Sequence, residues 1–479
     1  MPGKNFYITT TLPYVNAEPH LGFALEIVRA DSLARWQRFL GQTVFFNTGV
    51  DEHGLKIYRK AQEQQQEPQA YCDVMAAKFE QLKSALNLSY DSFIRTTNPA
   101  HETAVQEFWQ RCLAQGDIYK KNYQVRYCVG CELEKTGSEL VNNHCPEHPN
   151  QELEVIDEEN YFFRFSKYQQ PLLDFYEQHP DFVIPSFRFN EIKKFVATGL
   201  EDFSISRLRT KMPWGVGVPN DPEQVMYVWF DALINYISCL GWPQSSNYEQ
   251  FWPGLQICGK DNLRQQTAMW QAMLMSAGLP NSRQVLINGF ITAQGQKMSK
   301  SIGNVVNPLS LIEQYGTDAV RYYLLAELNP FEDSDYTAEK FAIRYQADLA
   351  NGLGNVVARV ATMLEQDNIK LSLNKAVNKG LLEQVKVKLD KYLFNEALAV
   401  LWSVLHHADE ILSIKKPWTM TVVTEKEKCL GPIVQDLYDV ANILQVFMPE
   451  TAAKLLSQLT AKQIVKAEPL FPRIEKGNK

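Results

Sequence analysis

The sequence lacks features that would place it in a membrane or outside the cell. No apolar run of about 18 residues, the length that crosses a bilayer, occurs in it. The eight cysteines are scattered apart from one small cluster, which favours reduced thiols and one metal site over a disulfide framework. The N-terminus is typical of a strand rather than a signal peptide. We therefore predict a cytoplasmic protein.

The chain also lacks the excess of positive charge that announces many nucleic-acid-binding proteins, because its net charge is −7. The charge is unevenly distributed. From Lys340 onward there are 19 basic and 15 acidic residues, whereas the preceding part has 29 basic and 40 acidic residues. A basic C-terminal third is a modest indication of contact with a polyanion, although charge alone favours an ordinary solvated helical surface.

What the sequence does contain first is an alternation of strand and helix signals. Strands expected at 6–12 and 43–49 flank a helix expected at 21–41. This unit predicts a parallel sheet, in which ligands bind beyond the carboxyl ends of the strands. The alternation stops after Asp117 and resumes with strand signals in 224–230, 254–261 and 284–290. The nucleotide-binding fold is therefore predicted to be split by an insert.

The insert contains two pairs of soft metal ligands. Cys128 and Cys131 are separated by two residues, and Cys145 and His148 follow with the same spacing after thirteen intervening residues. Four such ligands are typical of a closed, structural zinc site. A single pair would also fit a redox or accidental motif, and His144 is a possible competing ligand.

These patterns predict an α/β protein of roughly three domains with a split doubly wound, Rossmann-like catalytic domain, a zinc-bearing insert and an all-α C-terminal helical domain, since long amphipathic helices dominate from about residue 340. The predicted segments are the first catalytic half at 1–117, the inserted connective module with its zinc knuckle at 118–223, the second catalytic half at 224–290, a linking module at 291–339 and the helical domain at 340–479.

Two short motifs suggest phosphate chemistry. His20 and Gly22 lie at the start of the first predicted helix, where free N–H groups favour an anion, although a capping histidine explains the pattern as well. Lys297 and Lys300 lie in the sequence KMSKS on a glycine-flanked turn. They would stabilise negative charge as pyrophosphate leaves, although a solvated basic loop is the ordinary alternative. The conjunction of the two motifs is highly specific.

This pair is the signature of the class I aminoacyl-tRNA synthetases, and the chain resembles the methionyl-tRNA synthetases of the compact bacterial type. The resemblance covers nearly the whole chain. It rests on the stretches TTLPYVNAEPHLGFA, GVDEHG, DSFIRTT, NYFFRFSKY, GLEDFSISR, YVWFDALINY, GKD, KMSKS, GTDAVRYYLL, ADLANGLGN and KKPW.

The resemblance implies a set of residue roles. His20, Gly22, Lys297 and Lys300 would be catalytic and would bind ATP, together with Lys260 and Asp261, and Arg207 matches an active-site position of less certain role. Asp51 would hold the α-ammonium group of the amino acid. The amino-acid site would also include Leu12, Tyr14, Trp229, Ala232, Tyr236, Asn262, Gln266 and Trp270. Aromatic rings suit a polarisable thioether, although each ring taken alone fits plain core packing.

In the helical domain the resemblance implies an anticodon-binding set. Asn355 and Arg359 lie one helical turn apart, and Trp418 follows Pro417. An amide and a guanidinium can bond to splayed base edges, and a tryptophan can stack on a base. Without the resemblance, a capped helix pair with a core tryptophan would be the simpler interpretation.

The sequence departs from the family pattern at two places. Phe23 stands where the family usually has a second histidine or a small residue. Asn262, Gln265 and Gln266 stand where it usually has an apolar residue, an aromatic residue and a histidine. The second departure raises the question of which amino acid fits the pocket.

The resemblance implies a methionine–tRNA ligase that uses ATP with Mg²⁺, holds one structural Zn²⁺ and acts on methionine and tRNA(Met). We expect a monomer with no membrane association. Three alternatives remain at this point: a paralogue of the same fold that charges another amino acid, a tRNA-binding protein that has lost catalysis, and a small nucleotidyltransferase.

Overall fold

The computed structural model describes residues 5–131, 133–135, 140–298 and 303–474. By its internal contacts the chain divides into two compact units, each built from separate stretches of sequence. Unit 1 consists of Met1–Pro19, Gln42–Gln81 and Tyr90–Asn288, and unit 2 consists of His20–Gly41, Leu82–Ser89 and Gly289–Lys479.

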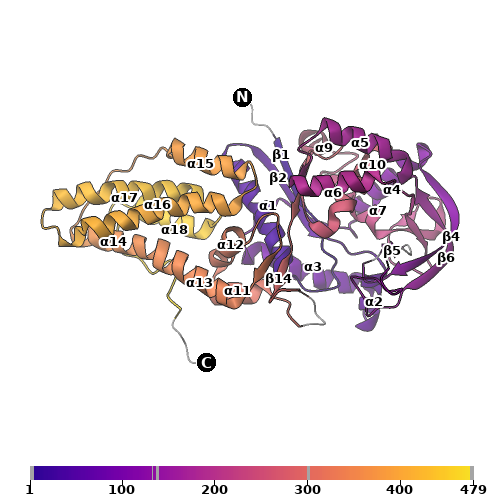
Figure 1. The fold of residues 1–479 in the computed structure, drawn as a ribbon, viewed down its shortest axis with the longest axis horizontal. Helices are drawn as coiled ribbons and strands as arrows, with labels where there is room; N and C mark the ends of the chain where they lie inside the picture. Colours follow the sequence, from indigo (N-terminus) through magenta and orange to yellow (C-terminus); the bar gives the residue numbers. More distant parts are fainter. Residues whose placement is uncertain (1–4, 132, 136–139, 299–302, 475–479) are drawn as a thin grey trace. The chain divides into compact units, whose positions relative to one another are not determined.

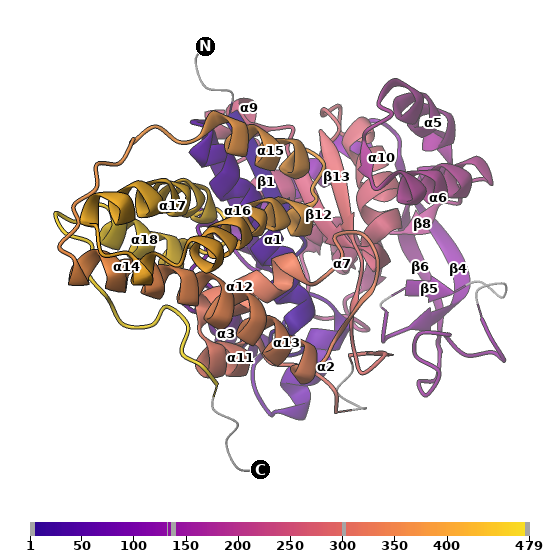
Figure 2. The same cartoon turned by 60° about the vertical axis from the view of Figure 1, so that its left-hand side comes forward.

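A six-stranded sheet forms the centre of unit 1. All of its strand pairs are parallel, and the order is β3-β2-β1-β12-β13-β7. Strands from before and after the insert therefore lie side by side, as β1, β12 and β13 do in Figure 2, which confirms the split doubly wound fold. The strands are β1 (Asn5–Thr10), β2 (Thr43–Val50), β3 (Ser92–Arg95), β7 (Val183–Ile184), β12 (Leu255–Gly259) and β13 (Gln284–Asn288).

The prediction of one strand over 224–230 is wrong. The strand there, β11 (Asp221–Met226), pairs antiparallel with β9 (Ser206–Leu208) and β10 (Gly217–Val218) outside the parallel sheet, and helix α7 begins directly after it at Val228. The run of apolar residues satisfies a strand and a buried helix equally well. Asp231 in the first helical turn favours the helix, because a carboxylate there interacts well with the helix dipole.

The insert contains a second, antiparallel sheet in the order β5-β4-β6-β8. Its long ribbon pairs β4 with β6 over ten residue pairs, from Ile118 opposite Phe163 to Tyr127 opposite Glu154. The predicted loss of helical periodicity after Asp117 is thus confirmed. The strands are β4 (Ile118–Cys128), β5 (Leu133–Lys135), β6 (Glu154–Phe163) and β8 (Phe203–Ser204).

Helices cover the sheet of unit 1, and aromatic residues fill the core between them. Phe108 stacks on Trp270 at 5.7 Å between ring centroids, and Trp109 meets Phe230 edge-on at 5.3 Å. The helices that lie within or begin in this unit are α2 (Leu55–Glu63), α3 (Pro68–Ala85), α4 (Pro99–Ala114), α5 (Gln169–Gln178), α6 (Ser186–Ala197), α7 (Val228–Ala232), α8 (Asn235–Ser238), α9 (Ser246–Phe251) and α10 (Trp270–Ser276), with 3-10 turns Phe165–Tyr168 and Lys260–Asn262 and a π-helical turn Gln265–Met269.

Unit 2 begins with the first helix of the chain and ends with a helical bundle (Figure 1). Its small sheet has the order β15-β14-β16, and no strand follows β16 among the residues that the structure describes. The elements are α1 (Leu21–Phe39), β14 (Ile291–Ala293), β15 (Gln296–Lys297), α11 (Pro308–Tyr315), α12 (Thr317–Ala326), β16 (Ser334–Tyr336), α13 (Ala338–Arg344), a π-helical stretch Tyr345–Gly354, α14 (Asn355–Gln366), α15 (Lys379–Leu389), α16 (Phe394–Lys415), a 3-10 turn Pro417–Thr419, α17 (Val423–Leu444) and α18 (Pro449–Leu459).

One stretch of the described chain, Phe394–Thr419, is long and apolar enough to cross a membrane by length and composition alone. It consists of α16 and the turn after it. The helix packs against α12, α15 and α17, and its buried positions, such as Leu401 and Leu405, recur with helical spacing. Packing in the bundle therefore accounts for its apolar character.

Candidate functional site

Several predicted amino-acid-site residues follow the carboxyl ends of the parallel strands in unit 1. Tyr14 follows β1 and Asp51 follows β2, and the two form an isolated parallel bridge. The backbone N–H of Asp51 donates to Pro13 at 2.9 Å, and that of Val15 donates to the Asp51 carbonyl at 3.2 Å. The Asp51 side chain is buried, and its Oδ1 accepts weakly from the Thr96 hydroxyl at 3.5 Å. The carboxylate is thus fixed at the strand edge where ligands bind in such sheets.

Aromatic residues from α7, α8 and α10 extend this site. Tyr14 meets Trp229 edge-on at 6.5 Å, and Tyr236 lies 5.9 Å from Trp270. Ala232 is buried on the same short helix as Trp229. The predicted aromatic set is therefore built from neighbouring elements, while Leu12 lies half-buried in the loop after β1.

The two glutamines that depart from the family pattern are both buried, and Gln266 is fully bonded. Its Nε2 donates to the Tyr236 hydroxyl at 2.6 Å, and its Oε1 accepts from Gln256 at 3.3 Å. Ser282 holds Gln256 in turn, by donating to its Oε1 at 2.6 Å. Gln265 differs, because its buried Oε1 meets no donor among the described residues. The amide of Gln266 therefore supports Tyr236, one of the predicted amino-acid-site residues.

The other predicted residues of unit 1 lie at the edge of this arrangement. Lys260 and Asp261 form the 3-10 turn directly after β12, and the half-buried Asn262 lies only 3.4 Å from the Asp261 carboxylate. Arg207 is buried and is held by cation–π contacts with Tyr227 at 4.7 Å and Tyr127 at 5.3 Å. This stacked guanidinium is a buried cation in the unit that also contains Asp51.

Lys56, which was not predicted from the sequence, connects Tyr14 with the insert. Its Nζ donates to the Gly130 carbonyl at 2.9 Å and lies 5.5 Å from the centre of the Tyr14 ring. Gly130 lies between Cys128 and Cys131. The metal-ligand cluster is thus joined to a pocket residue through one side chain.

Unit 1 also contains a buried histidine–aspartate cluster that was not predicted from the sequence. His53 and His101 both bond to Asp231, at 2.6 Å and 2.8 Å, and all three side chains are buried. His53 follows Asp51 by two residues, and Asp231 lies between Trp229 and Ala232. Their place inside the quoted stretches GVDEHG and YVWFDALINY was the available signal.

The predicted phosphate-binding residues belong to unit 2. His20 is the N-cap of α1, and its Nδ1 accepts from the Gly22 N–H at 3.0 Å. A Cβ on Gly22 would lie 2.9 Å from the His20 ring, so glycine keeps the cap in place. Phe23 is buried in the first turn. Backbone N–H groups at this terminus suit an anion.

The two lysines of the KMSKS sequence are only partly described. Lys297 ends the short strand β15 and pairs there with Thr292. Lys300 lies outside the described residues. The N–H of Leu21, at the first position of α1, donates to the Val306 carbonyl at 3.0 Å. The start of α1 is therefore bonded to the segment that follows the KMSKS sequence.

The four predicted metal ligands come together in the insert. The ligand atoms of Cys128, Cys131, Cys145 and His148 all lie within 4.8 Å of one another. Cys131 Sγ is 3.5 Å from Cys145 Sγ, and Cys128 Sγ is 3.7 Å from His148 Nδ1. Two sulfurs bound tetrahedrally to one zinc lie about 3.8 Å apart. The donor set therefore fits one zinc ion, and the exposed His144 lies outside the cluster.

Two of the three predicted anticodon residues meet in unit 2. The Arg359 guanidinium lies 5.1 Å from the centre of the Trp418 ring and pairs with Asp409 at 2.5 Å. Trp418 is 49% exposed, so it is not a core residue. Asn355 is half-buried one turn before Arg359 on α14. An exposed indole beside a cation is a surface on which a base can stack.

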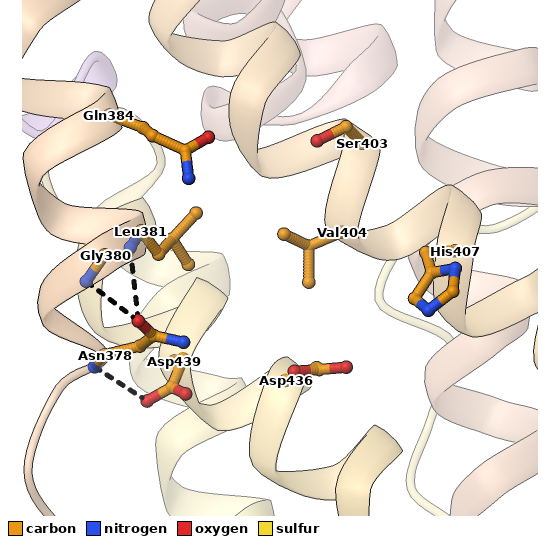
Figure 3. A pocket seen from close by; sticks show the side chains of 9 residues that line it. All are labelled: Asn378, Gly380, Leu381, Gln384, Ser403, Val404, His407, Asp436 and Asp439. Carbon is orange, nitrogen blue, oxygen red and sulfur yellow. Dashed lines mark hydrogen bonds between the residues drawn. The ribbon is translucent and has the colours of Figure 1, made fainter.

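A cavity of about 370 Å³ in the helical bundle contains none of the predicted residues. Figure 3 shows Asp436 and His407 at one side of it and the bonded Asn378 and Asp439 at another. Burial raises the pKa of Asp436, and the neighbouring Asp439 raises it further. The cavity is lined by residues of α15, α16 and α17 and by Asn378.

Comparisons with known proteins identify the family of the chain. Residues 6–154 and 134–361 match the family model described as tRNA synthetases class I (M). The chain is 41% identical over 478 residues to the methionine–tRNA ligase of Nostoc sp., covering 95% of this chain and 90% of that protein. It is 37% identical to the methionine–tRNA ligase of Thermotoga maritima over 509 residues, covering 98% and 80%.

A solved structure extends the similarity to three dimensions. The Mycobacterium tuberculosis methionyl-tRNA synthetase in complex with methionyl-adenylate matches with a TM-score of 0.92 and 36% identity, over 98% of this chain and 100% of that one. The fold, the insert and the helical bundle therefore all have counterparts in that structure.

Proposed function

The chain belongs to the methionine branch of the class I tRNA synthetases, and from this premise we propose that it activates methionine with ATP and transfers it to tRNA(Met). The observation that carries the proposal is the site at the strand ends in unit 1. The buried residue Asp51 forms a backbone bridge with Tyr14, and the Tyr14 ring contacts the Trp229 ring. A carboxylate beside aromatic rings suits an ammonium group next to a thioether.

The reaction needs no side-chain nucleophile. The methionine carboxylate attacks the α-phosphate of ATP, pyrophosphate leaves, and the terminal ribose hydroxyl of the tRNA then attacks the methionyl-adenylate. Catalysis is therefore positioning and charge stabilisation. His20 and the N–H groups of α1 would bind phosphate, and Lys297 and Lys300 would stabilise the transition state. Lys260 and Asp261 would contact ATP, which would enter with Mg²⁺.

The zinc site is structural in this proposal. Cys128, Cys131, Cys145 and His148 would supply four protein ligands, which leaves no open position for catalysis. Glycine at position 130 supports the assignment, because a Cβ there would lie 2.5 Å from the His148 ring. The loop is thus shaped to bring the histidine onto the cysteines.

The remaining parts of the proposal concern partners and organisation. Asn355, Arg359 and Trp418 would read the anticodon, and the segments 1–117, 118–223, 224–290, 291–339 and 340–479 would be the functional domains. All eight cysteines are free thiols in the structure, which fits an enzyme acting in the cytoplasm. We also propose that it acts as a monomer.

An ATP–pyrophosphate exchange assay across all twenty amino acids tests the proposal. Methionine should give the highest kcat/KM, and added tRNA(Met) should become charged in the same preparation. Exchange driven best by another amino acid would contradict the substrate, and absence of exchange with every amino acid would contradict the activity.

A further inference from the structure

A buried chain of hydrogen bonds in unit 1 links four segments of sequence. The Ser238 hydroxyl of α8 bonds to His101 Nδ1 at 2.7 Å, and His101 Nε2 bonds to Asp231 Oδ1 of α7 at 2.8 Å. The other carboxylate oxygen of Asp231 bonds to His53 Nδ1 at 2.6 Å. We call Ser238, His101, Asp231 and His53 the histidine–aspartate chain. None of these side chains belongs to the predicted chemistry.

Within the histidine–aspartate chain, Asp231 and His53 stabilise each other's charged forms. Burial acts to raise the pKa of Asp231, but the two histidines lower it to about 2, so the carboxylate is ionised at any working pH. Burial acts to lower the pKa of His53, and Asp231 outweighs it, with Glu102 of α4 and the adjacent Glu52 adding to the rise. The Trp214 ring covers His53 edge-on at 5.6 Å. An ionised Asp231 that is fully buried thus depends on both imidazole donors.

The histidine–aspartate chain connects the two parts of the proposed amino-acid site, which are Asp51 and the short helices that carry Trp229 and Tyr236. At one end, the His53 backbone N–H points at Oδ1 of Asp51, two residues earlier in the sequence, at 3.4 Å. Asp231 lies on the five-residue helix α7 with Trp229 and Ala232, and Ser238 lies on α8 with Tyr236. Helices of this length have little stability of their own. Their position against the strand-end carboxylate therefore depends on contacts such as these.

We propose that His53, Asp231 and His101 are positioning residues that hold the wall formed by Trp229, Ala232 and Tyr236 at a fixed distance from the ammonium anchor Asp51. This inference rests on the proposed function, because it concerns how the same site binds methionine. The three residues would therefore affect the affinity for methionine and would have no direct part in the reaction with ATP.

The test compares two substitutions at one position. His53→Ala leaves one oxygen of the buried Asp231 carboxylate without its donor, and an unpaired buried acceptor of this kind costs enough to change affinity by about tenfold or more. We expect the Kd for methionine, measured by isothermal titration calorimetry, and the KM for methionine in exchange to rise by about that factor. His53→Gln can still donate an amide N–H to Asp231 and should stay within about threefold of the wild-type values.

The controls separate positioning from general destabilisation. The kcat of exchange and the KM for ATP should change by less than about threefold in both variants. Asp318→Asn alters another buried carboxylate, which bonds to the Thr451 N–H in unit 2. It should leave the Kd for methionine unchanged even if it lowers the melting temperature.

Three outcomes would overturn the inference: an unchanged Kd for methionine in His53→Ala, an equal change of kcat and both KM values, or a failure of His53→Gln to recover affinity. If His53→Ala does not fold, Ser238→Ala is decisive. It removes only the last bond of the histidine–aspartate chain and should raise the Kd for methionine about threefold, with a fall in melting temperature no larger than that of Asp318→Asn. A wild-type protein inactive with methionine would instead contradict the proposed function.

Discussion

At the residue scale, the buried Gln266 does not require a polar substrate. A buried amide left unpaired would favour a substrate that satisfies it. Gln266 is not in that position, because Tyr236 accepts from its Nε2 and Gln256 donates to its Oε1. The glutamine instead supports the buried Tyr236. Membership of the methionine branch is consistent with this arrangement.

Substitution of Gln266 should therefore act on methionine use through Tyr236. Gln266→Leu removes the hydrogen bonds to the Tyr236 hydroxyl and the Gln256 amide, and we expect kcat/KM for methionine to fall by about 1–3 kcal/mol. Gln266→His restores the residue that the family usually has there, and should leave methionine use unchanged or improve it. Pyrophosphate exchange kinetics measure both.

A different outcome would change the interpretation of the pocket. If Gln266→Leu used methionine as well as the wild type, the hydrogen bond to Tyr236 would have no part in the site. If Gln266→His instead moved preference toward another amino acid, the glutamine itself would be the determinant of specificity.

Candidate site residues could be proposed from the sequence, but the sequence did not indicate which side chains bond to each other. Asp51 and Trp229 stand in recognisable stretches, and the metal ligands have a spacing that few other sites share. His53 and Asp231 are 178 positions apart, and no local pattern connects them. Only the fold shows that two unremarkable residues beside the predicted ones form a buried pair.

At the scale of elements, the insert is held together where its two ligand pairs meet. The loop around Gly130 packs against the His148 ring and bonds to Lys56 of α2. Because this loop carries two of the four predicted ligands, its order should depend on the metal. The contact of Lys56 with Tyr14 extends that dependence to the amino-acid site.

Loss of the metal should therefore have a local and a functional effect. Cys145→Ser should reduce zinc content from about one per chain to near zero and expose the insert to limited proteolysis. We expect the KM for methionine to rise as well, because Lys56 loses its fixed partner. Cys429→Ser in α17 changes a cysteine outside the cluster and is the matched control. Freshly purified protein without zinc, or stability unaffected by chelation, would contradict the assignment.

Helices and strands could be predicted from the sequence where the apolar residues followed one clear period. The helix expected at 21–41 is α1, and Gly41 after it has the positive φ of 81° that favours glycine. The error at 224–230 arose because a short apolar run fits either period. The position of β7 was equally out of reach, since its two residues join the parallel sheet only through pairing with β13.

At the scale of the whole molecule, Trp418 adds a specific feature to the basic C-terminal third. Net charge alone favoured an ordinary surface, but here a 49% exposed indole lies against the Arg359 guanidinium. Asp409 holds the guanidinium in place. The bundle thus presents a cation and a flat ring together, which is the combination that binds unstacked bases.

Truncation of this ring should separate the two half-reactions. In Trp418→Ala a base loses its stacking surface, and we expect kcat/KM for tRNA(Met) in aminoacylation to fall by about 1–3 kcal/mol. Adenylate formation without tRNA should stay normal, since the methionine site belongs to unit 1 in this proposal. Ile414→Ala removes another exposed apolar side chain of the bundle, 68% exposed on α16, and should change neither reaction. An equal fall of both reactions in Trp418→Ala would show that the residue supports the fold rather than the anticodon.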